Sequence, residues 1–525
     1  MSFVSPAFFL FLLAGRLAYG GWLYLARSSK GHRAISYGLA ILSAIFYSFA
    51  GLKWLLLLLL AAWISYFGAR KARWPAGSFR LWITIALLLL PLLLFKYVFF
   101  YIDVHNAGLD SLAAAPSARM QGVDALESSG FFLRLWNGPM LLLPLGISFY
   151  TFQNISYVVQ VARGTIEPRR SFVDYLAYLT FFPQLVAGPI VTGSAFFPQL
   201  DARPIPTMDD LWHGAFLMLR GYLWKVLLAD SMADLVDPVF SGGGRQGSAV
   251  AMAVLAFSFQ IYFDFQGYTL IALGVGRLFG IRLPENFFSP YLARGSRDFW
   301  RRWHVTLSAW LREHIYIPLG GSRRGLARTF LALFATMLLG GLWHGAHVNF
   351  LIWGGLHGLW LALEHSMGGR KNQRTIGREP GSTFAGEGRA SRILSRLGRQ
   401  GIRCITFAFV TLLWIPFRAG SEHNGWQVCV EVWQSLMGYL WHPVAWNGSF
   451  SVYLLFGAAL SAVCLEYLLR SRPASWLPSR ATGPQGGSGL MDLGQSLGRA
   501  ILVAAGVLTL LLLGSGRQEF VYFVF

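Results

Sequence analysis

The sequence predicts an all-α membrane protein whose chain crosses the bilayer many times. Of its 525 residues, 55% are hydrophobic and only 13% are charged, which is too little polar surface for a water-soluble protein. A transmembrane helix needs roughly 20 apolar residues, and about ten to twelve such windows are spread from one end of the sequence to the other. We therefore expect one membrane domain over residues 1 to 525.

Charge predicts how the spans are oriented. The net charge of +20 comes mainly from arginines in short loops, and cytoplasmic loops carry an excess of basic residues. The basic residues also suit contact with an anionic inner leaflet. No zinc-finger, helix-turn-helix or aromatic RNA-reading pattern is present, so we expect no nucleic-acid partner. The three cysteines have no metal-ligand spacing and indicate no disulfide framework.

The first half of the chain is expected to contain five spans that alternate between the two sides of the membrane. Their loops fit this alternation, because the loops after the first, third and fifth spans are basic and the loop at 103 to 137 is acidic. Lys96, near the end of the fourth span, can extend its ammonium group to the interface. The five windows are residues 7 to 26, 34 to 50, 54 to 68, 81 to 101 and 143 to 161.

A broken or re-entrant helix is expected after residue 170. Here an apolar stretch is interrupted by Pro183, Gly188 and Pro189, and proline removes a backbone donor and kinks a helix. Spans at 211 to 229 and 249 to 279 follow. The second contains Asp264 within its apolar run, and we expect this carboxylate either to form a buried pair with an arginine or to take part in chemistry.

The stretch from 298 to 365 carries most of the ionisable residues that lie near apolar sequence. It holds six arginines, six histidines and two glutamates, and ionisable groups at membrane depth point to function. Aromatic and aliphatic residues at helical spacing predict an interfacial helix over 298 to 317. A helical hairpin follows at 329 to 342 and 348 to 363. Because basic loops flank it, we expect its tip to lie deep in the membrane or towards the outside.

The last part of the chain is expected to hold a flexible basic loop and further spans. The loop covers 368 to 400 and is rich in Gly and Ser. Spans are predicted at 402 to 416, 451 to 469 and 501 to 513, with a tryptophan-rich interfacial piece at 426 to 446.

His344 is the first candidate for a catalytic base. It stands at the hairpin tip in the motif Leu-Trp-His-Gly, where a cytoplasmic donor and an external acceptor could meet. A neutral imidazole can take up a proton near neutral pH, and acyl transfer from a thioester to a hydroxyl needs such a base. Taken alone, a histidine flanked by Trp and Gly is more often a hydrogen-bonded core residue, so the motif does not decide between the two interpretations.

His304, in Arg-Arg-Trp-His, is the second candidate. Its neighbours Arg301 and Arg302 could hold the phosphates of a nucleotide-bearing carrier. The alternative is a structural histidine beside a basic loop that sets the topology.

Two further histidines lie close to His344 in the sequence. His344 and His347 are spaced i, i+3 and could share a helix face, but no third ligand lies nearby, so no metal site is expected. His357 could support His344 by a hydrogen bond, or simply pack.

Six stretches of the sequence, found in order over most of residues 1 to 420, point to one family. They are LPLGISFYTFQNISYVV, YLTFFPQLVAGPIV, FDFQGYTLIALGVGRLFGI, LPENFFSPY, RDFWRRWHVTLSAWLREHIYIPLGGSRRG and MLLGGLWHGAHVNFLIWGGLHG. Together they resemble the membrane-bound O-acyltransferase (MBOAT) family, in particular its bacterial alginate O-acetyltransferase branch.

This resemblance implies a ring of transmembrane, re-entrant and interfacial helices around a central tunnel. It implies that the family's invariant histidine is His344 and its second histidine is His304. We expect the catalytic core at 170 to 365 and C-terminal helices at 401 to 525. The candidate substrate-binding residues are Arg301, Arg302, Trp303, Trp343, Asp264 and His357.

The resemblance also implies a donor, an acceptor and partners. It implies an acetyl group that is taken from acetyl-CoA or another cytoplasmic thioester, with no bound cofactor. The acetyl group would pass across the bacterial inner membrane to an exported polysaccharide such as alginate, through periplasmic or membrane-anchored acetyltransferase partners. Two alternatives stay open. One is a transporter or channel, because buried His, Asp and Arg also line ion paths; the other is an acyltransferase for a lipid, teichoic acid or protein.

Overall fold

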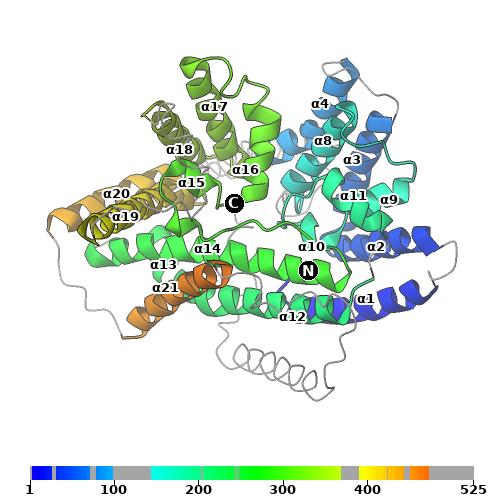
Figure 1. Ribbon diagram of the computed structural model, residues 1–525, viewed down its shortest axis with the longest axis horizontal. Helices are drawn as coiled ribbons and strands as arrows, with labels where there is room; N and C mark the ends of the chain where they lie inside the picture. Colours follow the sequence, from blue (N-terminus) through cyan, green and yellow to red (C-terminus); the bar gives the residue numbers. More distant parts are fainter. Residues whose placement is uncertain are drawn as a thin grey trace, which may run out of the picture. The chain divides into compact units, whose positions relative to one another are not determined.

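The computed structural model describes residues 3–25, 31–70, 79–98, 144–202, 205–242, 245, 247–367, 389–422, 424–442 and 450–471. Every regular element within these ranges is a helix (Figure 1). Seven helices in this part of the chain are long and apolar enough to cross a membrane: Pro6–Tyr24, Leu52–Arg70, Phe79–Val98, Gly247–Leu278, Leu326–His344, Gln400–Ala419 and Ser451–Leu468.

The predicted all-helical, multi-pass membrane protein is therefore confirmed. The acidic loop at 103 to 137 and the span predicted at 501 to 513 lie outside the described residues, and the total of ten to twelve spans stays a prediction. One boundary was wrong. The loop predicted at 368 to 400 is helical from Arg389 onward, where Ile393 and Leu397 are spaced one helical turn apart.

The chain divides into two compact units, and the first consists of Tyr19–Val186 and Thr192–Asp201. Helix α8 lies in its interior, because every residue of α8 is buried. Asn154 on α8 accepts hydrogen bonds from the hydroxyls of Ser65 at 2.6 Å and Tyr175 at 2.5 Å, which join three helices. The elements of this unit are α2 (Gly31–Ser48), α3 (Leu52–Arg70), α4 (Phe79–Leu93), η1 (Leu94–Val98), α8 (Ile147–Ala162), α9 (Phe172–Leu179), α10 (Phe182–Leu185) and α11 (Gly193–Asp201).

The helix break predicted near Pro183 is confirmed. Helix α9 ends at Leu179, and α10 is only four residues long and has Pro183 in its first turn, where the missing N–H costs no helical hydrogen bond. No helix is present from 186 to 192, the stretch that contains Gly188 and Pro189.

The second unit consists of Ser2–Ala18, Ala187–Val191 and Ala202–Phe525. Besides the first part of α1 (Pro6–Leu25), its elements are α12 (Met208–Leu223), η2 (Trp224–Ala229), α13 (Asp230–Phe240), α14 (Gly247–Leu278), η3 (Pro290–Leu292), α15 (Ser296–Trp300), α16 (Val305–Leu311), η4 (Arg312–Tyr316), α17 (Leu326–His344), α18 (Val348–Met367), α19 (Arg389–Ala419), α20 (Gly425–Trp441) and α21 (Phe450–Ser471).

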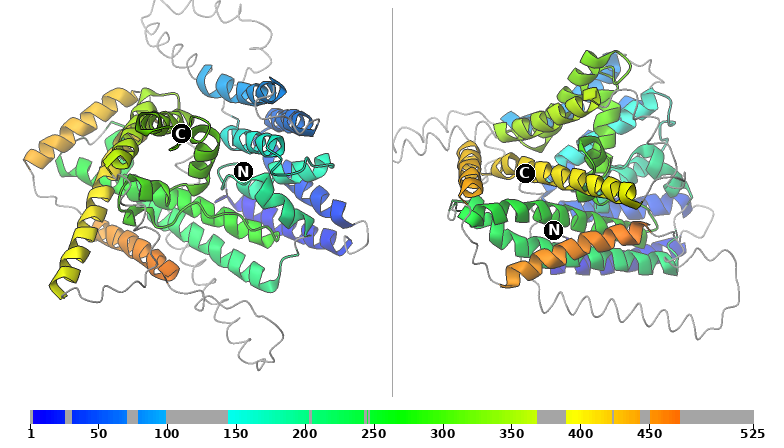
Figure 2. Two further views of the ribbon diagram at one scale, coloured as in Figure 1. Left: turned by 45° about the horizontal axis from the view of Figure 1, so that its top comes forward. Right: turned by 60° about the vertical axis from the view of Figure 1, so that its left-hand side comes forward.

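Helices α12 and α14 run side by side within the second unit (Figures 1 and 2). Their backbones touch at two glycine pairs. A Cβ atom on Gly214 would lie 2.8 Å from the carbonyl oxygen of Gly274, and one on Gly221 would lie 2.6 Å from that of Gly267. Small residues allow this approach, and packing of this kind is how helices associate where the surrounding lipid is as apolar as the side chains.

The predicted helical hairpin is confirmed as α17 and α18, which are joined through residues 345 to 347. The two helices also meet at glycines, because a Cβ atom on Gly354 would lie 3.0 Å from the Cα atom of Gly341. This close contact fixes the end of α17, which is His344.

The single interfacial helix predicted over 298 to 317 was wrong. The chain instead forms α15, a turn, α16 and the short π-helix η4. His304 stands directly before α16 with φ 41°, a left-handed conformation that a continuous helix could not contain. The backbone N–H of Val305 donates to the carbonyl of Asn286 at 2.9 Å, so a distant segment takes the donor that a continuous helix would have used internally.

Candidate functional site

His344 is the last residue of α17 and is surrounded by aromatic rings. Its ring centroid lies 4.7 Å from that of Trp343, 5.2 Å from that of Trp353 and 5.0 Å from that of Phe417. The residue is 7% exposed. This imidazole therefore lies in an apolar enclosure that three helices build, because Trp353 belongs to α18 and Phe417 to α19.

His304 lies beside Phe265 and Trp343. The ring centroids are 4.8 Å apart for Phe265 and 6.2 Å apart for Trp343, and His304 is only 1% exposed. Burial lowers the pKa of His304 to about 3, so its imidazole is neutral over the whole physiological range. A neutral imidazole has one N–H donor and one acceptor nitrogen.

Trp343 contacts both candidate catalytic histidines. Its ring centroid lies 6.2 Å from that of His304 and 4.7 Å from that of His344. The structure thus brings His304, Trp343 and His344 into one cluster, although the two histidines are 40 positions apart in the sequence.

His347 is not on the same helix as His344, so the shared helix face considered for this pair was wrong. Helix α17 ends at His344, and the backbone N–H of Asn349 donates to Nδ1 of His347 at 3.2 Å. Burial lowers the pKa of His347. Among the residues that the structure describes, no group of three His, Cys, Asp or Glu side chains could hold a metal ion.

His357 packs and does not hydrogen-bond to His344. Both of its ring nitrogens are buried and have no hydrogen-bond partner among the described residues, and Trp353 lies between the two histidines. Its ring stacks on Phe299 of α15, with 5.9 Å between centroids, and meets the edge of Trp300 at 5.1 Å. His357 is therefore part of the aromatic cluster that also contains Trp353, Phe299 and Trp300.

The N-terminus of α15 is held by a carboxylate from α18. Glu364 accepts hydrogen bonds from the backbone N–H of Ser296 at 2.6 Å and from its hydroxyl at 2.5 Å. Carboxylates stabilise helix N-termini because the first backbone N–H groups have no partner within the helix. This contact fixes the helix that presents Phe299 and Trp300 to His357.

Arg301 and Arg302 lie in the turn after α15 and differ from each other. Arg301 is exposed, whereas Nε of Arg302 donates to Asp298 at 2.8 Å. Trp303, in contrast, is buried and packs on Trp414 with 5.0 Å between centroids. Of these three side chains, Arg301 is thus the one that is open to an anionic group.

Asp264 forms a buried ion pair, but its partner is a lysine and not the arginine we expected. Nζ of Lys225 lies 2.8 Å from Asp264 and 2.7 Å from Asp230, and the three side chains are at most 3% exposed. Lys225 belongs to the π-helix η2, a local widening that is often found at functional sites. The cluster joins α13 and α14 through η2.

Sequence reasoning missed Phe417, Trp353 and Lys225. Trp353 is an ordinary apolar residue of a predicted span, Phe417 directly follows the span predicted at 402 to 416, and neither carries a chemical pattern. Lys225 did carry a signal, because it is a charged residue inside the window at 211 to 229, just as Asp264 is inside the next one.

The fold and this site define a multi-pass membrane protein in which two buried histidines contact the same tryptophan, Trp343. The chain belongs to the MBOAT, membrane-bound O-acyltransferase family, whose sequence model matches residues 39–377. The resemblance seen in the sequence is thereby confirmed.

Individual relatives are similar over much of the chain. A probable alginate O-acetylase, AlgI, of Pseudomonas aeruginosa is 34% identical over 82% of this chain and 74% of its own length. The AlgI of Pseudomonas syringae pv. tomato is 37% identical over 63% of this chain, and the match spans little more than half of that protein, 55%. A peptidoglycan O-acetyltransferase of Helicobacter pylori is 34% identical over 81% of this chain and 78% of its own length.

Proposed function

We propose that this protein transfers an acetyl group from a cytoplasmic thioester, acetyl-CoA, across the bacterial inner membrane for O-acetylation of an exported polysaccharide such as alginate. The observation that carries the proposal is the position of His344, a histidine at the tip of the α17–α18 hairpin inside an aromatic enclosure. Family membership and the similarity to alginate O-acetylases support it.

In the proposed reaction, His344 acts as the general base. Its neutral imidazole takes the proton of the acceptor hydroxyl while that oxygen attacks the thioester carbonyl. A carbon–oxygen bond forms, the carbon–sulfur bond breaks, and the proton passes from His344 to the departing thiolate. The aromatic enclosure excludes water, which strengthens the electrostatic interactions in the site and protects the thioester from hydrolysis.

His304, which also contacts Trp343, positions the donor. Because its imidazole stays neutral, it can donate a hydrogen bond to a carbonyl without adding a charge to the apolar layer. Arg301 is exposed in the adjoining turn and suits the phosphates of a nucleotide-bearing donor. Periplasmic or membrane-anchored acetyltransferases are the partners that would carry the acetyl group to the polymer.

The proposal is tested in liposomes that contain the purified protein and radiolabelled acetyl-CoA. We expect release of CoA and label on an added acceptor for the wild-type protein, and loss of both for His344→Ala. The matched control is His442→Ala, because His442 is an exposed histidine at the end of α20. Full transfer by His344→Ala would contradict the assignment of the base.

The acceptor is tested in the same assay with three acceptors in parallel: an alginate polymer, peptidoglycan fragments and lipoteichoic acid. The last two are included because relatives include the peptidoglycan O-acetyltransferase and a teichoic acid D-alanyltransferase of Streptococcus thermophilus, which is 28% identical over 46% of this chain. Label on alginate alone supports the proposal, and label on another acceptor alone replaces it.

A transporter is the second candidate, because the Lys225–Asp264 pair is an intramembrane charge cluster of the kind found in ion paths. Ion flux into the liposomes without any acetyl transfer would favour it.

A further inference from the structure

Phe417, near the end of α19, is one of the rings that enclose His344. The two ring planes are 74° apart, so one ring presents its edge to the other. Phe417 also meets Trp353 at 5.0 Å and Phe350 at 5.3 Å between centroids, and it is 1% exposed. The orientation of the His344 ring therefore depends on where the end of α19 lies.

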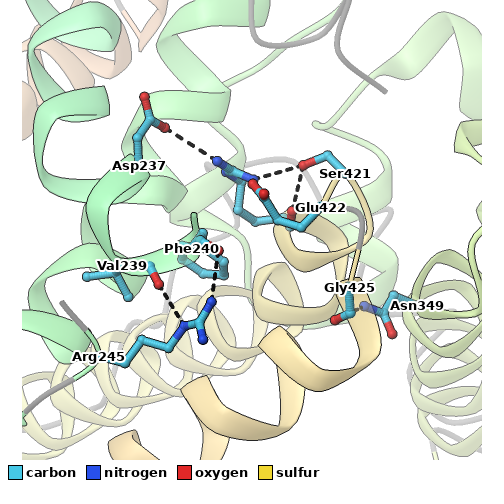
Figure 3. A network of polar contacts seen from close by, with 9 residues as sticks. Asp237, Val239, Phe240, Arg245, Asn349, Ser421, Glu422 and Gly425 are labelled. Carbon is cyan, nitrogen blue, oxygen red and sulfur yellow. Dashed lines mark hydrogen bonds and ion pairs between the residues drawn. The ribbon is translucent and has the colours of Figure 1, made fainter. Parts of the chain in front are cut away.

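The next residue, Arg418, fixes that end. Its guanidinium donates to the carboxylate of Asp237 on α13 at 3.4 Å, to the hydroxyl of Ser421 at 2.8 Å and to Glu422 (Figure 3). Arg418 is itself buried. A planar guanidinium with several donors in fixed directions holds such partners in one geometry.

The start of α20, the helix that follows α19, is tied to α18. Nδ2 of Asn349 donates to the carbonyl of Gly425 at 2.7 Å, and this pair is visible beside the arginine network in Figure 3. Asn349 is fully buried and lies five residues after His344. Arg418 therefore ties the end of α19 to α13, and the start of the following helix is tied to α18.

We infer that Arg418 is a positioning residue for His344 and acts through Phe417. This inference rests on the proposed function, because it concerns the orientation of the base in acyl transfer. Arg418 keeps the end of α19 in place, Phe417 then packs against the His344 ring, and the ring nitrogen stays aimed at the acceptor hydroxyl. A misplacement of about 1 Å at a reacting group can lower a rate by roughly 100-fold.

The test compares Arg418→Gln with Arg245→Gln in the acetyl-transfer assay. Arg245 is a matched control because it also bonds α13, at the carbonyls of Val239 and Phe240, and pairs with Glu431 of α20, yet none of these partners is one of the rings that enclose His344. We expect Arg418→Gln to lower kcat by about 10- to 100-fold with little change in KM for acetyl-CoA. Arg418→Lys should retain more activity than Arg418→Gln, and Arg245→Gln should keep the wild-type kcat.

A double-mutant cycle shows whether Arg418 acts through Phe417. Phe417→Leu alone should lower kcat, and adding Arg418→Gln to it should cause little further loss, because both changes free the same ring. The inference would be overturned if the kcat losses of the two single variants simply multiplied in the double variant. A normal kcat for Arg418→Gln, in a protein that elutes as a folded species, would overturn it as well. If the wild-type protein transfers no acetyl group, the proposed function fails instead, so the two failures are distinguishable.

Discussion

Replacement of Lys225 by methionine tests the buried charge cluster in the second unit. The ammonium group lies within 2.8 Å of two carboxylates, and the three side chains are at most 3% exposed. Methionine keeps most of the unbranched stem but leaves Asp230 and Asp264 buried without their cation. Removal of one partner of a buried ion pair costs about 3–5 kcal/mol.

The exposed pair of Arg169 and Asp201 is the comparison. It has the same 2.8 Å separation, but its side chains are 19% and 48% exposed. Such surface pairs contribute about 0–1 kcal/mol, because water screens them. The equal distance and unequal burial separate the effect of desolvation from that of geometry.

The assay is unfolding of the detergent-solubilised protein by titration with SDS, followed by circular dichroism. We expect Lys225→Met to lower the free energy of unfolding by about 3 kcal/mol or more, and Arg169→Met by about 1 kcal/mol or less. Adding Asp264→Asn to Lys225→Met should recover part of the loss, because one buried charge is removed. Equal effects of the two single variants would refute the argument from burial.

Two further predictions concern pH and close packing. Because burial lowers the pKa of His304 from 6.5 to about 3, only the unfolded chain binds this proton between those values, and stability is lost as the pH falls through that window. Between pH 6.5 and 5 we expect a loss of about 2 kcal/mol from this residue, and a shallower pH dependence of unfolding for His304→Gln. Gly221→Ala should destabilise the protein in the same unfolding assay, since the new Cβ atom would lie 2.6 Å from the Gly267 carbonyl. Gly438→Ala, which meets nothing within 4 Å, should be neutral or stabilising by up to about 1 kcal/mol.

The long helices could be predicted from the sequence because each one needs only an apolar window. The window at 249 to 279 matches α14 within two residues, and the windows at 329 to 342 and 348 to 363 match the hairpin. Local composition decides these elements, since a backbone in lipid must satisfy its hydrogen bonds within its own helix.

The stretch at 298 to 317 shows where this reasoning stops. Its helical spacing was real, but the N–H of Val305 bonds to Asn286, and His304 takes a left-handed conformation. A local pattern cannot report a hydrogen bond to a distant segment. The same holds for Asp264, whose partner is Lys225 because α14 meets η2 there, and the sequence did not show which spans are neighbours.

The proposed function gives the two candidate histidines different roles, and their surroundings differ in this structure. His304 is 1% exposed and stands in a strained turn, whereas His344 is 7% exposed at a helix end. A base must come within hydrogen-bond reach of the proton it takes, so we propose the more accessible ring, His344, as the one that meets the acceptor. In the same proposal, His304 acts through the donor. The sequence motifs marked both histidines, but it is the aromatic walls from α18 and α19 that distinguish them.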